Sequence, residues 1–145
     1  MRPGSWEESP YGNEQQSQGI SMIRGIGTDF IETQRIRNSL RKNADRFIKR
    51  ILTQAEQAYV AEKIDPAPYV AARFAAKEAI LKALGTGLAK GINWTDMEIL
   101  RDGSGAPSVK LSGQAKTIAQ EKGIKTIHIS LSHTQNAALA FAVAE

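Results

Sequence analysis

The residues between Val70 and Gly87 constrain the fold more than any other stretch of this chain. The run VAARFAAKEAILKAL consists of strong helix formers and contains no interior Gly or Pro. Pro66 and Pro68 lie just upstream, where a helix is entered, and Gly85 stands where a left-handed residue would end it. We therefore expect a helix over residues 70–84.

Small side chains dominate one face of this helix. Alanines recur at three- and four-residue spacing, so they line up on that face, and they are Ala72, Ala75, Ala76, Ala79 and Ala83. Such a face would let the helix backbone approach a sheet closely. Four charged residues interrupt the apolar background: Arg73, Lys77, Glu78 and Lys82.

Two interpretations of these charges follow from the spacing. In the first, the segment is a surface helix, and Glu78 and Lys82 form an i,i+4 ion pair that contributes a few tenths of a kcal/mol. In the second, the carboxylate serves a divalent cation and the neighbouring cations serve phosphates. Spacing alone leaves both interpretations open.

Composition limits the class of protein. The 145 residues are enough for one domain, and 41% hydrophobic with 23% charged residues is ordinary globular composition. The absence of Cys excludes disulfides, thiolate metal sites and Cys nucleophiles, and two His argue against a His-based metal cluster. No apolar run approaches the roughly 20 residues of a membrane span, and no signal peptide is visible. We expect a soluble, cytoplasmic protein.

The first 21 residues differ from the rest of the chain. They are polar, carry Gly, Gln, Ser, Asn and Pro, and show no hydrophobic periodicity. We expect a disordered N-terminal extension or tag over residues 1–21 and one folded domain over residues 22–145.

A basic helical region is expected over residues 32–64. Seven cations fall within sixteen residues: Arg35, Arg37, Arg41, Lys42, Arg46, Lys49 and Arg50. Asn43 is a candidate break, and Thr53 with Glu56 forms a capping box that opens a further helix. With a net charge of +4, this region favours an anionic partner. A nucleic-acid-binding module is one alternative, although the region lacks the aromatic residues that single-strand binders commonly interleave with their cations.

The remaining segments indicate an α+β fold with a mainly antiparallel sheet. Strands are expected over residues 23–31, 125–131 and 137–143, a hairpin over 96–111 and a helix over 114–122. Asp29 lies on the glycine side of the first strand, and His133 follows another strand directly. Alternate alanines of the last strand predict tight cover by a helix or by a second subunit.

Three blocks of sequence together carry a family resemblance. They are GIGTD at 25–29, RFAAKEA with KALGTG at 73–79 and 82–87, and SLSHT at 130–134. In this order and spacing they closely resemble the bacterial holo-[acyl carrier protein] synthases, which are small trimeric 4′-phosphopantetheinyl transferases. The resemblance covers residues 22–145. Thr28 and Phe30 depart from the family's usual aliphatic residues but keep β propensity.

The resemblance implies a reaction, a cofactor and partners. The family transfers 4′-phosphopantetheine from coenzyme A to a serine of apo-acyl carrier protein in fatty acid biosynthesis, and it releases adenosine 3′,5′-bisphosphate. It uses Mg²⁺, forms a homotrimer and binds coenzyme A in clefts at subunit interfaces. No nucleic acid or membrane takes part.

The resemblance also implies roles for individual residues. Asp29 and Glu78 would hold Mg²⁺ and Lys82 would lie against the pyrophosphate, so these three form the catalytic group. Either Glu78 or a metal-bound water would take the serine proton. The coenzyme A cleft would be completed by Arg73 and His133 near the 3′-phosphate, with Lys77, Gly85, Thr86, Gly87 and Ser132 lining it. The acidic carrier would dock on Arg35, Arg46 and Arg50.

Overall fold

The structure, a computed structural model, describes residues 20–145 and is organised around helix α3, Ala67–Leu84. The helix begins three residues before the expected Val70, because Pro68 lies in the first turn, where its missing N–H costs no helical hydrogen bond. Gly85 ends it in the left-handed conformation, with φ 75°. Most of its residues are buried, so the surface-helix interpretation is wrong.

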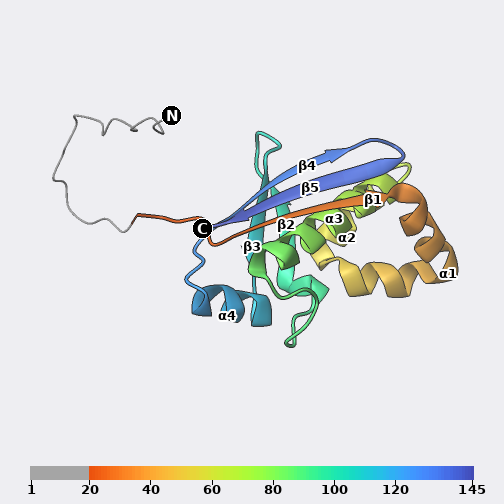
Figure 1. Ribbon diagram of the computed structural model, residues 1–145. Helices are drawn as coiled ribbons and strands as arrows, with labels where there is room; N and C mark the ends of the chain where they lie inside the picture. Colours follow the sequence, from red (N-terminus) through yellow and green to blue (C-terminus); the bar gives the residue numbers. More distant parts are fainter. Residues whose placement is uncertain (1–19) are drawn as a thin grey trace, which may run out of the picture.

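A three-stranded antiparallel sheet covers one side of α3 (Figure 1). It has the order β1-β5-β4, with β1 at Gly25–Glu32, β5 at Ala137–Ala144 and β4 at Ile127–His133. Residues on alternate sides of each strand point toward α3 or away from it. The buried alanines of β5 lie on the α3 side, so a helix of the same subunit provides their cover.

Glycines on β1 allow this close approach. A Cβ at Gly27 would lie 2.0 Å from the carbonyl oxygen of Ala79 on α3, and a Cβ at Gly25 would lie 2.0 Å from that of Ala83. Asp29 follows on the same side of the strand. The close packing of β1 and α3 therefore fixes the position of Asp29 relative to α3.

Two helices connect β1 to α3. Helix α1, Thr33–Ile51, is interrupted at Asn43, which has φ −163° and ψ 92°, as the sequence predicted. Helix α2, Gln54–Ala61, opens with the predicted capping box of Thr53 and Glu56.

The chain after α3 supplies a hairpin and a short helix. A 3₁₀ turn, η1 (Trp94–Asp96), leads into the antiparallel pair β2 (Met97–Arg101) and β3 (Pro107–Leu111). Helix α4, Gly113–Glu121, precedes β4. In the view of Figure 1 the hairpin runs across the sheet. Helix α4 lies at the opposite side of the molecule from α1.

The outer face of the sheet exposes large apolar side chains. Ile26 and Phe30 of β1 are 69% and 64% exposed, and Phe141 of β5 is 52% exposed. An apolar patch of this kind marks an interaction surface. Among residues 20–145 no helix has the length and apolarity needed to cross a membrane. The predicted N-terminal extension falls, apart from its last two residues, outside the described residues.

Candidate active site

Two carboxylates from distant parts of the chain meet where β1 packs on α3. Asp29 points from β1 toward the helix, and Glu78 lies on α3, half-buried. Burial raises the pKa of Glu78 above its usual range, and the nearby Asp29 carboxylate raises it further. The fold therefore brings together the two acidic residues that the sequence singled out.

Lys82 lies beside this acidic pair. Its Nζ donates a hydrogen bond of 2.8 Å to the Thr28 carbonyl oxygen and lies 3.4 Å from Oδ1 of Asp29. Helical spacing predicted that Lys82 would pair with Glu78, whereas in the structure Lys82 pairs with Asp29 on β1. About half of the side chain is exposed, at 53%, so the ammonium is accessible to a ligand.

The donor set fits a hard divalent cation that binds together with a phosphate. In the described part of the chain no group of three or more His, Cys, Asp or Glu side chains is arranged to hold a metal ion. Asp29 and Glu78 thus supply two carboxylates only. Mg²⁺ is commonly bound by one or two carboxylates, with substrate phosphates and water completing the octahedron.

A second cluster surrounds Arg73. Arg73 as a whole is 2% exposed, and its guanidinium carbon lies 4.1 Å from the centroid of the Tyr59 ring. Burial lowers the pKa of Arg73. Its Nε and Nη1 have no hydrogen-bond partner in the structure. Buried donors without partners are costly, so this arginine is suited to an anionic acceptor supplied from outside the chain.

Aromatic rings connect Arg73 to His133. The Tyr59 and Tyr69 rings meet edge to face at 6.0 Å, and Tyr69 meets His133 in the same way at 5.1 Å. Lys63 lies over both tyrosine rings. A hollow of about 560 Å³ opens beside Tyr69, Lys63 and His133. The sequence did not predict a role for the two tyrosines, because nothing in their spacing relates them to Arg73.

The two clusters lie on different sides of α3. Arg73 and Glu78 are five residues apart, which corresponds to about 7.5 Å along a helix axis and roughly 140° around it. Arg73 therefore points to a different side of α3 from Glu78.

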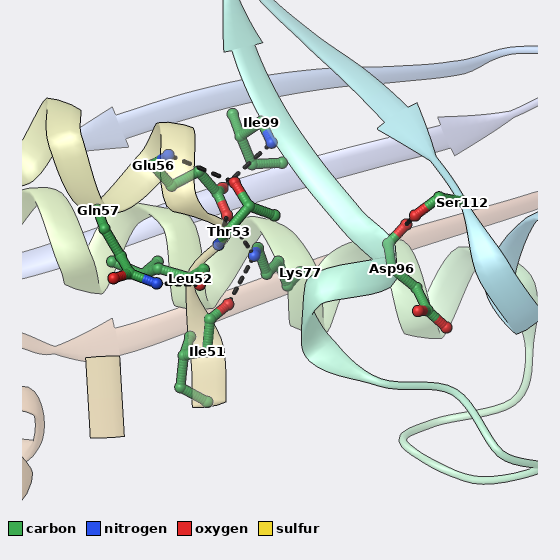
Figure 2. A network of polar contacts seen from close by, with 9 residues as sticks. All are labelled: Ile51, Leu52, Thr53, Glu56, Gln57, Lys77, Asp96, Ile99 and Ser112. Carbon is green, nitrogen blue, oxygen red and sulfur yellow. Dashed lines mark hydrogen bonds and ion pairs between the residues drawn. The ribbon is translucent and has the colours of Figure 1, made fainter. Parts of the chain in front are cut away.

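Lys77 is buried away from any ligand, and Ser132 lies on the exposed outer face of the sheet. Lys77 is fully buried, and its Nζ lies 2.6 Å from both Oε1 of Glu56 and the Ile51 carbonyl oxygen (Figure 2). Burial lowers its pKa, and the ammonium has no path to a ligand. Ser132 lies on the outer face of the sheet, because alternation along β4 turns it away from the side of His133.

The turn after α3 remains accessible. Gly85, Thr86 and Gly87 are partly or fully exposed, and Thr86 Oγ1 donates a hydrogen bond to the Gly87 carbonyl oxygen at 2.9 Å. Lys122, the residue directly after α4, donates a hydrogen bond to the Leu84 carbonyl oxygen, which anchors the end of α3.

The basic residues of α1 form an exposed surface. Arg35, Arg46 and Arg50 are all exposed. Arg35 is close enough for its charge to oppose the rise in the pKa of Glu78. The break at Asn43 leaves a shallow hollow of about 230 Å³ against Arg46, Phe47 and Arg50.

Comparison with known proteins identifies the family. A family model described as the 4′-phosphopantetheinyl transferase superfamily matches residues 25–142. The chain belongs to this superfamily. The holo-[acyl-carrier-protein] synthase of Maridesulfovibrio salexigens is 48% identical over 124 residues, which are 86% of this chain and 99% of that protein.

Solved structures of other phosphopantetheinyl transferases share the fold. The holo-[acyl-carrier-protein] synthase of Neisseria meningitidis superposes with a TM-score of 0.79 at 38% identity, over 86% of this chain and 99% of that one. The enzyme of Bacillus anthracis, solved in complex with CoA (3′,5′-ADP), gives a TM-score of 0.71 at 37% identity. The superposition covers 86% of this chain and 98% of that one. The predicted α+β, antiparallel fold is confirmed.

Proposed function

We propose that this chain transfers 4′-phosphopantetheine from coenzyme A to a serine of apo-acyl carrier protein. Adenosine 3′,5′-bisphosphate is the second product. The convergence of Asp29, Glu78 and Lys82 at the junction of β1 and α3 carries this proposal, in a chain whose relatives are holo-[acyl-carrier-protein] synthases. Family membership leaves the nucleic-acid alternative without support.

The acidic pair and Lys82 would act on the pyrophosphate of coenzyme A. Asp29 and Glu78 would hold Mg²⁺, which supplies charge neutralisation for the phosphate oxygens when bound. Lys82, which is exposed and only 3.4 Å from Asp29, would add a second positive charge. Positioning and charge neutralisation account for most of the catalysis in a phosphoryl transfer of this kind.

The serine hydroxyl of the carrier then attacks the β-phosphorus. A bond forms between the serine oxygen and phosphorus, and the bond from phosphorus to the bridging pyrophosphate oxygen breaks, so that the bisphosphate leaves. The serine proton needs an acceptor. Either Glu78 or a metal-bound water would accept it, since both would lie beside the reacting phosphate.

A cleft between subunits would unite the two clusters. We place the 3′-phosphate against Arg73 and His133, since Arg73 has buried donors without partners. Arg73 leaves α3 on a different side from Glu78 of its own subunit, so the Arg73 cluster of one copy would complete the site of its neighbour. The exposed apolar face of the sheet, with Ile26, Phe30 and Phe141, supports assembly into the homotrimer.

The carrier would dock on α1. Arg35, Arg46 and Arg50 are exposed there, and an acidic carrier protein complements their charge. Arg35 also lies near Glu78, so a docked carrier would present its serine close to the acidic pair. Such docking weakens as salt screens the charges.

The mass of the carrier tests the proposal. The chain is incubated with apo-acyl carrier protein, coenzyme A and Mg²⁺, and the carrier is weighed by mass spectrometry. The expected result is a mass increase of one phosphopantetheine group, lost when a chelator removes the metal or when the acceptor serine is replaced by alanine. An unchanged carrier mass with metal present would refute the proposal.

A further inference from the structure

A fully buried ion pair lies directly behind the proposed active site. Lys77 immediately precedes Glu78 on α3, and neither Lys77 nor its partner Glu56 exposes any of its side chain to solvent. The side chains of Lys77 and Glu78 lie about 100° apart around the helix. Lys77 therefore points into the interior on the side of α2 and β2, and Glu78 meets β1. Burying both charges requires a close and fully hydrogen-bonded geometry.

Glu56 uses both carboxylate oxygens at this point. Oε1 accepts hydrogen bonds from Nζ of Lys77 at 2.6 Å and from the Thr53 N–H at 2.9 Å. Oε2 accepts from the Ile99 N–H of β2 at 3.1 Å. The carboxylate thus joins the start of α2 to α3 and to the hairpin (Figure 2).

Lys77 adds a fourth element to this junction. Its Nζ donates at 2.6 Å to the carbonyl oxygen of Ile51, the last residue of α1. The carboxyl end of a helix carries partial negative charge, so a buried ammonium there is doubly favourable. The pair therefore fastens the end of α1 to α3, one residue away from Glu78.

The buried hydrogen bond from Lys77 is one of the contacts that orient the second half of α1. The break at Asn43 interrupts the helix, so its first half does not rigidly direct the second. Ile51 and Leu52 are buried and hold this end in the core, but apolar burial is non-directional. Two hydrogen bonds add direction at this end: the buried one from Lys77 to the Ile51 carbonyl oxygen and one from Gln57 Nε2 to the Leu52 carbonyl oxygen.

We propose that Glu56 and Lys77 are positioning residues that set where Arg46 and Arg50 lie relative to Glu78. Neither touches the substrate. They fix the angle at which a carrier docked on α1 presents its serine to the acidic pair. This inference rests on the proposed docking of the carrier on α1.

The double variant Glu56→Leu/Lys77→Met tests the proposal. It removes one positive and one negative charge, so the net charge and the long-range attraction of an acidic carrier stay the same. Replacing a buried ion pair by apolar residues of similar volume is often neutral for stability. The variant nevertheless loses the hydrogen bond to Ile51.

Steady-state kinetics provide the readout. We expect the KM for the apo-carrier to rise about tenfold, which is 1.4 kcal/mol of lost binding, with the KM for coenzyme A unchanged and the thermal midpoint near that of the wild type. A merely structural role would lower kcat through a smaller folded fraction and leave both KM values unchanged. Replacing Arg46 by Ala should also raise the carrier KM less in the double variant than in the wild type, because a misplaced Arg46 contributes less to carrier binding.

A second variant covers the case in which the first does not fold. Glu56→Gln/Lys77→Gln keeps hydrogen-bonding groups at both positions, but the amide at residue 77 is shorter than the lysine and does not reach both residue 56 and the Ile51 carbonyl oxygen, so the same rise in carrier KM is expected. Unchanged carrier KM, an equal rise in both KM values, or loss of folding in both variants would overturn the proposal. Wild-type transfer to the carrier, measured alongside, separates these outcomes from failure of the proposed function.

Discussion

Replacing Gly27 by Ala tests how closely β1 must approach α3. The added Cβ would lie 2.0 Å from the Ala79 carbonyl oxygen and 2.9 Å from the Ala83 nitrogen. An ordinary contact needs about 3.4 Å, so the shortfall to the oxygen is about 1.4 Å (3.4 minus 2.0). Both obstructing atoms are backbone atoms of a buried helix and have no rotamer to change. The strand itself must therefore move away.

The expected cost is large for a single methyl group. Overpacking of a core typically costs about 1–3 kcal/mol, and we expect Gly27→Ala to lose about 3 kcal/mol of unfolding free energy, at the upper end of that range. For a domain of this size this lowers the melting temperature by about 10 °C. Urea and thermal unfolding, followed by circular dichroism, measure both quantities.

A glycine in the hairpin provides the matched control. A Cβ at Gly103 would meet no atom within 4 Å, so Gly103→Ala should stay within about 0.5 kcal/mol of the wild type. Because Asp29 is two residues beyond Gly27, the retreat of β1 should also reduce Mg²⁺-dependent transfer at temperatures where the variant is folded. Equal stability of the two variants would show that the close packing of β1 on α3 is not as described.

Three further predictions concern single side chains. The pKa of Glu78 in the folded chain is raised above its ordinary value of 4.5, so the free energy of unfolding falls as the pH rises from 4.5 through that raised pKa. Without divalent cation, calorimetry should therefore find that Glu78→Gln melts higher than the wild type at pH 7 and at the same temperature at pH 4. The same variant should abolish Mg²⁺-dependent turnover. A lower melting point at pH 7 would contradict this. Arg46→Glu should weaken binding of the carrier more than binding of coenzyme A, measured by titration calorimetry, and equal losses would argue against docking on α1. Arg73→Met should remove most of a preference for coenzyme A over dephospho-coenzyme A, about 10- to 100-fold in kcat/KM for one charged hydrogen-bonded contact; an undiminished preference would place the 3′-phosphate elsewhere.

Local patterns were sufficient to predict most elements of the fold. The α3 helix, the capping box at Thr53 and the break at Asn43 each follow from the conformational preferences of a few neighbouring residues. The alternation of β1 also placed Asp29 on the side that faces α3. These features depend on short-range physics, which a sequence displays directly.

The directions of the buried cations were not predictable in this way. Helical spacing made Lys77 a neighbour of Glu78, but its partner Glu56 lies 21 residues earlier and was recognised only as a capping residue. An alanine-rich helix that is buried on nearly all sides has no polar face from which to infer where a lysine points. Tyr59 and Tyr69 were missed for a related reason, since their stacking with Arg73 and His133 arises only when the elements pack.

The central claim is that Asp29 and Glu78 together hold one divalent cation against the phosphates of coenzyme A. Titration with Mn²⁺ in the presence of coenzyme A, followed by electron paramagnetic resonance of the free ion, tests it most directly. We expect saturable binding to the wild type, and binding at least about tenfold weaker for both Asp29→Asn and Glu78→Gln. Glu121→Gln, on the exposed side of α4, is the matched control and should bind as the wild type does. Wild-type affinity in either of the first two variants would contradict the shared site.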